Sequence, residues 1–82
     1  MKDDRLVQMR VFRAVVETGG FTAAAHALAA SQSFVSQTVQ RLEARLGTKL
    51  LHRTTRGQRM TPEGERFLDA ARQVIAAVER AE

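Results

Sequence analysis

The chain has 82 residues, 44% of them hydrophobic and 27% charged, and a formal net charge of +4. That length and composition fit one small folded domain and exclude a disordered chain. The absence of cysteine excludes a disulfide scaffold and a thiolate metal site. No apolar run reaches the roughly 18 residues of a membrane span and no signal peptide is visible, so we expect a cytoplasmic protein.

Two helices are expected in the first third of the chain. Residues 3–20 place apolar side chains at helical spacing, at Leu6, Met9, Phe12 and Val16. Two aspartates suit the positive end of this helix, and the pair Gly19–Gly20 predicts its end. Thr22 is then expected to cap a short helix running through Leu28.

The stretch SQSFVSQTVQRLEARLG predicts a third helix. Ser31 is a favourable N-cap, and Gly47 is a favourable residue just after the helix. The buried stripe is expected at Val35, Val39, Leu42 and Leu46. The opposite side carries neutral hydrogen-bonding groups and one arginine, namely Ser33, Ser36, Gln37, Gln40 and Arg41. Soluble helices usually carry Glu and Lys on such a face, so its composition needs another explanation.

A small hairpin and a long helix are expected after Gly47. Residues 49–51 and 58–60 are candidate strands around the basic loop HRTTRG. Thr61 and Pro62 predict the start of a helix that continues to about the end of the chain, roughly 20 residues and 30 Å. Its apolar stripe comprises Phe67, Ala71, Val74, Ile75 and Val78. Because so small a core cannot cover this length, we expect the surplus apolar surface, especially Val74 to Val78, to pack against a partner.

This order of elements predicts a mainly α fold: a winged helix-turn-helix of three helices and a β-hairpin wing, followed by a long C-terminal helix. In such a fold the second helix of the motif enters the DNA major groove. Serine and glutamine offer the hydrogen-bonding groups that base edges require, whereas an acid would be repelled by the phosphates. The alternative is a serine- and glutamine-rich face without a partner.

Basic residues concentrate between positions 41 and 59, where a single acid, Glu43, accompanies them. They are Arg41, Arg45, Lys49, Arg53, Arg56 and Arg59. With a pI of about 11.1, this distribution favours a nucleic-acid partner, although a solvated basic face is the alternative. Arg56 is our choice for a minor-groove contact, and Arg53 and Thr54 for phosphate contacts. A plain solvated turn would also account for this loop.

The chain resembles the N-terminal DNA-binding domain of LysR-type bacterial transcriptional regulators. The matching stretches are MRVFRAVVETGGFTAAAHAL, SQSFVSQTVQRLEARLG, KLLHRTTRG and MTPEGERFL, in that order. The resemblance implies a winged helix-turn-helix over residues 1–61 and a linker helix over 62–82 that pairs with a second subunit. It also implies a C-terminal domain that binds the effector, so the chain is expected to be a piece of a longer protein.

The family's DNA-contacting positions fall on a defined set of residues in this chain. They are Thr22, Gln32, Ser33, Phe34, Ser36, Gln37, Arg53 and Arg56. Three of them depart from the family pattern, which often has Pro at Ser33, a small residue at Phe34, and Arg or Lys at Gln37. These departures should change which bases are read. Phe34 has two interpretations, contact with a thymine methyl or sugar and packing against the preceding helix.

We therefore expect sequence-specific binding of double-stranded DNA by a dimer at a palindromic site. Gln32, Ser33, Ser36 and Gln37 should face bases, and Thr22, Gln40, Arg41 and Thr54 should contact the backbone. The core is expected to comprise Leu6, Met9, Phe12, Leu28, Val35, Val39, Leu42, Leu46 and Phe67. The alternatives are a winged-helix protein-interaction module and, more remotely, a membrane-surface helix.

Catalysis is not expected from this chain. Its histidines, His26 and His52, fall on different predicted elements, and no carboxylate pair accompanies either at ligand spacing. We therefore assign no catalytic residue, cofactor or metal.

Overall fold

The computed structural model describes residues 4–55 and 57–82, so Arg56 lies outside the described residues. The elements follow in the order α1 (Arg5–Thr18), α2 (Phe21–Leu28), α3 (Gln32–Leu46), β1 (Leu51–Thr54), β2 (Gly57–Met60) and α4 (Pro62–Ala81). The strands form an antiparallel hairpin in which Leu51 pairs with Met60 and Thr54 with Gly57. The predicted fold class, a winged helix-turn-helix followed by a long helix, is confirmed.

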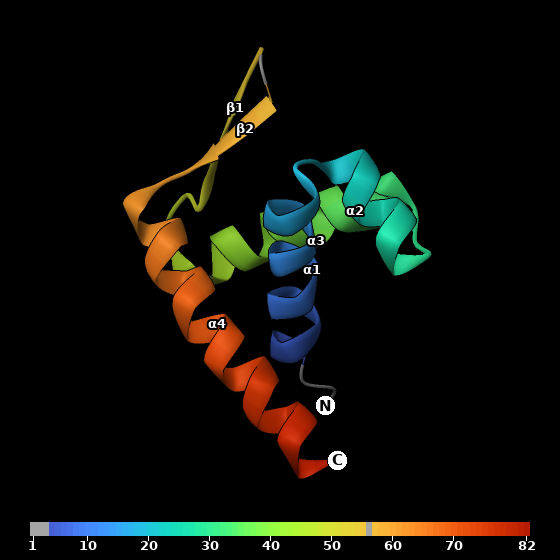
Figure 1. Cartoon of the computed structure of the whole chain (residues 1–82). Coiled ribbons are helices and arrows are strands. Elements are labelled where there is room, and N and C mark those ends of the chain that lie inside the picture. The colour runs from blue at the N-terminus through green and yellow to red at the C-terminus, as the bar shows by residue number, and fades with distance from the viewer. Residues whose placement is uncertain (1–3, 56) are drawn as a thin grey trace.

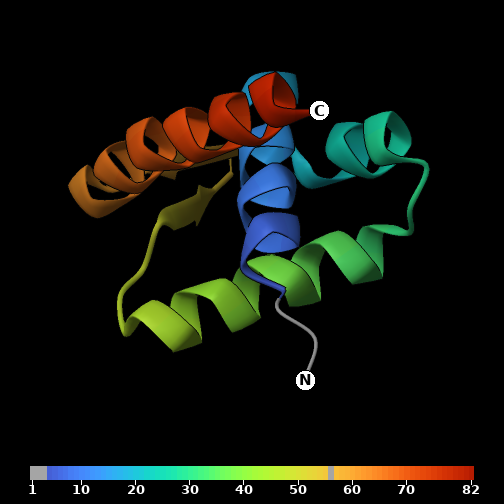
Figure 2. The ribbon, with the colours of Figure 1, turned by 90° about the horizontal axis from the view of Figure 1, so that it is seen from below.

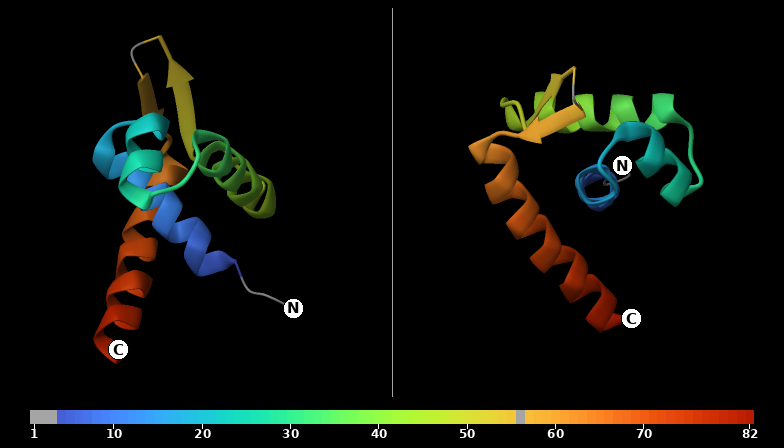
Figure 3. Two further views of the ribbon diagram at one scale, coloured as in Figure 1. Left: turned by 90° about the vertical axis from the view of Figure 1, so that its right-hand side faces the viewer. Right: turned by 45° about the horizontal axis from the view of Figure 1, so that its top comes forward.

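The hairpin and α3 share one end of the molecule, and α4 runs away from them. In Figure 1 the hairpin projects beyond the helices, while α4 descends from its base past α1. Figure 3 shows α3 lying beside the hairpin, with the end of α4 pointing the other way. Within residues 4–55 and 57–82, no helix combines the length and the apolarity that crossing a membrane requires.

The ends of α3 and the start of α4 lie where the capping residues predict. The Ser31 hydroxyl accepts a hydrogen bond from the backbone N–H of Phe34 at 3.0 Å. Gly47 ends α3 in the left-handed conformation, with φ of 69°. At the start of α4, the Thr61 hydroxyl accepts from the backbone N–H of Gly64 at 2.9 Å.

The short helix α2 differs from the prediction at its first residue. It begins at Phe21 with Gly20 as its N-cap, so Thr22 lies inside the first turn and the prediction that it caps the helix was wrong. The helix ends at Leu28, and the next residue, Ala29, is a non-glycine residue in the left-handed region with φ of 53°. The turn between α2 and α3 therefore begins with an alanine in a backbone conformation that glycine adopts more readily.

The core lies where α1 meets the other helices and the base of the hairpin. Its fully buried large side chains include Phe12, Val15, Val35, Leu42 and Leu50. The expectation that Leu28 and Leu46 belong to this core was wrong, since they are 36% and 38% exposed. Each is the last residue of its helix, and Figure 2 shows α1 crossing the middle of α3 and leaving its end uncovered. Leu6 and Met9 are only half-buried.

Lys49 and Leu50, just before the hairpin, are hydrogen-bonded to Thr61, the N-cap of α4. The first strand starts at Leu51, two residues later than expected, because the backbone of Lys49 and Leu50 bonds elsewhere. The Thr61 hydroxyl donates to the Lys49 carbonyl at 2.7 Å, and the Thr61 N–H donates to the Leu50 carbonyl at 3.0 Å. Gly64 packs so tightly on the Leu50 carbonyl that a Cβ atom there would overlap it.

Candidate nucleic-acid interface

The outward face of α3 consists of the residues expected to read DNA. Gln32, Ser33, Phe34, Gln37, Gln40 and Arg41 are exposed, and Ser36 is half-buried. On the opposite face Val35, Thr38, Val39 and Leu42 are buried. The structure therefore presents a polar, mostly uncharged helix face to solvent at the end of the molecule that carries the hairpin (Figure 3).

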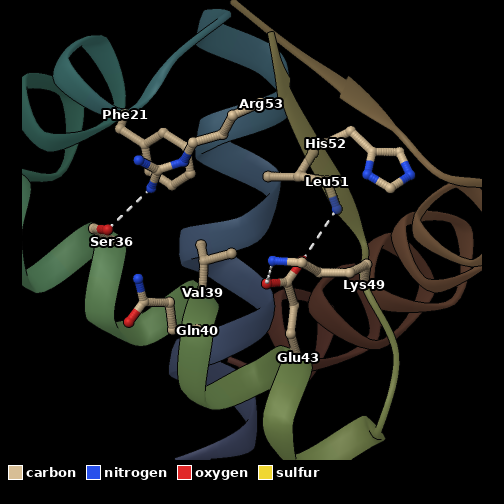
Figure 4. A pocket seen from close by; sticks show the side chains of 9 residues that line it. All are labelled: Phe21, Ser36, Val39, Gln40, Glu43, Lys49, Leu51, His52 and Arg53. Carbon is tan, nitrogen blue, oxygen red and sulfur yellow. Dashed lines mark hydrogen bonds and ion pairs between the residues drawn. The ribbon is translucent and has the colours of Figure 1, made fainter.

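Glu43, the only acid of α3, is turned away from that face. Its side chain is only 11% exposed, and its Oε2 accepts from the backbone N–H groups of Leu50 at 2.8 Å and Leu51 at 3.2 Å. Its Oε1 lies 3.6 Å from Lys49 Nζ (Figure 4). The carboxylate thus holds the base of the hairpin, and its negative charge is directed inward rather than toward a phosphate. Sequence reasoning did not assign Glu43 a role, although a lone acid among six bases was the available signal.

Arg53 joins the hairpin to both helices of the helix-turn-helix. Its guanidinium carbon lies 4.2 Å from the centroid of the Phe21 ring, which is a cation–π contact. Its Nη2 donates to the Ser36 hydroxyl at 3.0 Å (Figure 4). Phe21 received no role from the sequence, because nothing in the spacing indicates that the first residue of α2 faces β1.

A hollow of about 220 Å³ separates α3 from the hairpin. The side chains that line it, all labelled in Figure 4, are Phe21, Ser36, Val39, Gln40, Glu43, Lys49, Leu51, His52 and Arg53. The Glu43 carboxylate is bonded to the backbone. The exposed charged groups that line the hollow are therefore the cations of Lys49 and Arg53. This positive gap between a polar helix face and a projecting hairpin suits a phosphate backbone passing between two grooves.

Ser33 and Gln37, two departures from the family pattern, contact each other. Gln37 Nε2 donates to Ser33 Oγ at 3.2 Å, one helical turn apart. Phe34, the third departure, is 43% exposed and lies outside the buried core. Its exposed ring is available to a thymine methyl or a sugar.

The other predicted backbone contacts lie on separate elements. Thr22 is exposed in the first turn of α2, which contains no acid. Thr54 is exposed at the end of β1, where its hydroxyl donates to the Gly57 carbonyl at 3.2 Å. Arg56 lies outside the described residues, and its assignment to the minor groove stays a prediction.

The predicted interface stripe of α4 divides into buried and exposed parts. Ala71 and Ile75 are fully buried within the chain, so the expectation that they face a second subunit is corrected. Phe67 packs its ring edge-on to Phe12, with centroids 5.7 Å apart. Val74 is 42% exposed and Val78 is half-buried, and both line a groove beside α1.

Among the residues that the structure describes, no cluster of three His, Cys, Asp or Glu side chains could hold a metal ion. Both histidines are exposed, His26 on α2 and His52 on β1.

Comparison with known proteins identifies the family. Residues 6–65 match the family described as "Bacterial regulatory helix-turn-helix protein, lysR family". The chain belongs to this family. It is 45% identical over 73 residues to the HTH-type transcriptional regulator TfdT of Cupriavidus pinatubonensis, covering 89% of this chain and 32% of TfdT. It is 50% identical over 68 residues to the HTH-type transcriptional regulator BudR of Raoultella terrigena, covering 83% of this chain and 23% of BudR.

These LysR-type relatives are named as transcriptional regulators, not as enzymes. The chain spans about a third or less of their length. Solved structures match it more fully. The BenM DNA-binding domain in complex with catB site 1 DNA has a TM-score of 0.90 and 39% identity, covering 94% of this chain and 86% of that one. The CbnR DNA-binding domain in complex with DNA has a TM-score of 0.89 and 39% identity, covering 94% and 88%. The described fold is that of the DNA-binding domain of LysR-type regulators.

Proposed function

We propose that this chain binds double-stranded DNA sequence-specifically, with α3 in the major groove and the hairpin, residues 52–58, at the adjacent minor groove. The observation that carries the proposal is the outward face of α3, which is polar, mostly uncharged and free of exposed acid because Glu43 is turned inward. An α-helix is about 10–12 Å across, which suits a major groove about 12 Å wide. The similar BenM and CbnR DNA-binding domains were both solved in complex with DNA, which supports DNA as the partner.

In this arrangement each residue of the predicted interface has one role. Gln32, Ser33, Ser36 and Gln37 contact base edges, and Phe34 contacts a thymine methyl or a sugar. Thr22, Gln40, Arg41, Arg53 and Thr54 contact phosphates, and Arg56 enters the minor groove. The bond from Arg53 to Ser36 is compatible with a phosphate contact, because a guanidinium has five N–H donors. The first turn of α2 around Thr22 adds the attraction of a helix N-terminus for phosphate.

We also propose that two copies pair through α4 and bind a palindromic site. The groove between the start of α1 and the end of α4 has a volume of about 310 Å³ and is lined by Arg5, Leu6, Met9, Val74 and Val78. In Figure 1 the start of α1 and the end of α4 lie on the side of the molecule away from the hairpin. A two-fold dimer through this region would present two α3 helices to two half-sites.

The same proposal divides the chain between two tasks. Residues 1–61 contact DNA, and residues 62–82 link and pair the subunits. The regulator works in the bacterial cytoplasm, where its DNA lies. Effector binding belongs to a separate domain, since the named relatives extend well beyond the segment that they share with this chain.

Selection from a randomised duplex library tests the proposal directly. The domain is incubated with the library at near-physiological salt, and bound DNA is recovered and sequenced. We expect the enriched sequence to be an interrupted palindrome. The logarithm of its binding constant should fall by about 0.9 per neutralised phosphate for each tenfold rise in salt concentration. Salt-sensitive retention without enrichment would reduce the protein to a backbone binder. No retention would favour the alternative, a protein-interaction module.

A further inference from the structure

The hydroxyl of Ser36, on the reading face of α3, is hydrogen-bonded by an arginine from another element. Arg53 Nη2 donates to the Ser36 hydroxyl oxygen at 3.0 Å, and the guanidinium is itself fixed 4.2 Å from the centroid of the Phe21 ring. Ser36, Arg53 and Phe21 come from α3, β1 and α2 respectively. Figure 4 shows the three side chains together at the edge of the hollow between α3 and the hairpin.

This contact determines whether the Ser36 hydroxyl is left to donate or to accept a hydrogen bond from a ligand. A serine hydroxyl has a single hydrogen to donate and an oxygen that accepts. Here the oxygen accepts a charge-assisted bond, which is stronger than a neutral one. A second donor approaching the same oxygen would also approach the positive guanidinium, and this repulsion opposes it. Within the described part of the chain no hydrogen bond from the Ser36 hydroxyl to a protein acceptor is found, so its hydrogen remains available.

We propose that Arg53 fixes Ser36 as a hydrogen-bond donor and thereby sets which bases it accepts. This inference rests on the proposed entry of α3 into the major groove. There the acceptors are N7 and O6 of guanine, N7 of adenine and O4 of thymine, whereas cytosine presents an amino donor. Ser36 therefore selects an acceptor edge and discriminates against cytosine. Arg53 acts as a positioning residue in this selection, whatever phosphate contact its remaining N–H groups make.

The same polarity occurs one turn earlier at Ser33. Its oxygen accepts from Gln37 Nε2 at 3.2 Å, which leaves the Ser33 hydrogen and the Gln37 carbonyl oxygen for the groove. This neutral bond is longer than the one at Ser36 and has no charge to reinforce it. Ser36 is therefore the better residue for testing whether an accepted hydrogen bond fixes a serine as a donor toward DNA.

The first experiment removes single acceptors from the DNA. Starting from the site enriched by library selection, each purine of one half-site is replaced by its 7-deaza analogue. Each guanine is also replaced by 2-aminopurine, which lacks O6, and each pyrimidine by an analogue lacking the 4-substituent. Fluorescence anisotropy measures the affinity of the wild-type domain and of Ser36→Ala, which keeps a good helix former in α3. At one acceptor-bearing base we expect the wild type to lose about 3- to 10-fold, as for one neutral hydrogen bond, and Ser36→Ala to lose nothing further.

A second pair of variants isolates the role of Arg53. Arg53→Met keeps an apolar stem against Phe21 but removes the donor, so the penalty for cytosine at the Ser36 position should shrink toward that of Ser36→Ala. Arg59→Met removes an equal charge from the other strand, where Arg59 is exposed, and should weaken all sequences alike. Thermal melts of both variants confirm that they are folded. A specificity ratio that moves only in Arg53→Met supports positioning through Ser36.

Two results would overturn the inference. One is a Ser36-dependent loss at a cytosine deprived of its amino group, since Ser36 would then accept rather than donate. The other is the absence of any Ser36-dependent loss at any base. Either result is distinct from failure of the proposed function, in which the library would yield no enriched site at all.

Discussion

The carboxylate of Glu43 accepts a hydrogen bond from the backbone N–H of Leu50 at 2.8 Å, and this contact ties α3 to the hairpin. A second bond, from the N–H of Leu51, uses the same oxygen at 3.2 Å. One side chain thus satisfies two partly buried donors, at the residue before β1 and at the first residue of β1. It also keeps negative charge off the surface that we assign to DNA.

Glu43→Ala should therefore destabilise the fold by about 1–3 kcal/mol, because two partly buried N–H groups lose their acceptor. Urea unfolding followed by circular dichroism measures the change. Glu43→Gln, which keeps one acceptor oxygen, should lose less. Glu79→Ala, at an exposed position near the end of α4, serves as the control and should stay within about 0.5 kcal/mol. Equal effects at both sites would show that the Glu43 bonds add little.

Ala29→Gly should stabilise the protein by about 0.5–1 kcal/mol. Ala29 ends α2 with φ of 53°, a region that costs an L-residue about 1–2 kcal/mol and glycine almost nothing. The gain is partly offset by the greater freedom of glycine in the unfolded chain. Ala27→Gly, within the same helix, makes the same chemical change and should destabilise by about 0.5–1 kcal/mol. The opposite signs should be visible in thermal melts, and a shared sign would contradict the prediction.

Gly64→Ala should be among the most damaging single methyl additions in the chain. The new Cβ would overlap the Leu50 carbonyl, and this backbone is held by Thr61 and Glu43 and cannot retreat. We expect a loss above about 2 kcal/mol in denaturant unfolding. Gly20→Ala is the matched control, because its Cβ would meet only Gln58 Nε2 at an ordinary 3.8 Å. A mild effect at Gly64 would mean that α4 shifts easily on the hairpin base.

Val74→Asp should dissociate the proposed dimer. An aspartate at this position would place an unpaired charge in an apolar interface, which should raise the dimer dissociation constant at least about tenfold. Sedimentation equilibrium measures it, and binding to a palindromic duplex should weaken in parallel. Val7→Asp is the control, since Val7 is equally exposed, at 41% against 42%, but does not line the groove beside α4. If the Val74→Asp protein remains dimeric, the interface lies elsewhere.

Gln32→Ala should relax base preference at one position in each half-site, at a cost of about 1–3 kcal/mol for a bidentate pair with adenine. Gln32 is the first residue of α3 and is exposed, so its amide is open to a base edge. Competition assays with single-position site variants measure the preference. Gln73→Ala changes the same side chain on α4, where it bonds to Asp69, and should leave the preference intact. An unchanged profile in Gln32→Ala would remove Gln32 from the reading set.

Local signals in the sequence predicted the elements well. The caps at Ser31, Gly47 and Thr61 are side-chain and backbone preferences confined to one helical turn, and all three lie where they were expected. Helical periodicity also identified the buried face of α3 at Val35 and Val39. Such patterns report which way a residue points, and this depends only on its neighbours along the chain.

Which element covers the apolar face of a helix depends on how the helices cross, and the sequence was less informative about this packing. Leu46 belongs to the apolar stripe of α3, but it is the last residue of that helix and is 38% exposed. Ile75 belongs to the same apolar stripe of α4 as Val74 and Val78, yet it is fully buried within the chain, where α4 packs against α1. The contact of Arg53 with Phe21 joins residues 32 positions apart, and no local pattern encodes it.

The Thr61 hydroxyl donates to the Lys49 carbonyl and accepts from the Gly64 N–H, so one oxygen belongs both to the hairpin base and to the first turn of α4. Its burial, at 5% exposure, leaves little room for the two parts to slide. We therefore expect the base of the hairpin and the first turn of α4 to move together. In a dimer joined through α4, a few degrees of scissoring between the subunits would be amplified into a change in the distance between the two hairpin tips. The spacing or bend of the bound DNA would then report the angle between the subunits.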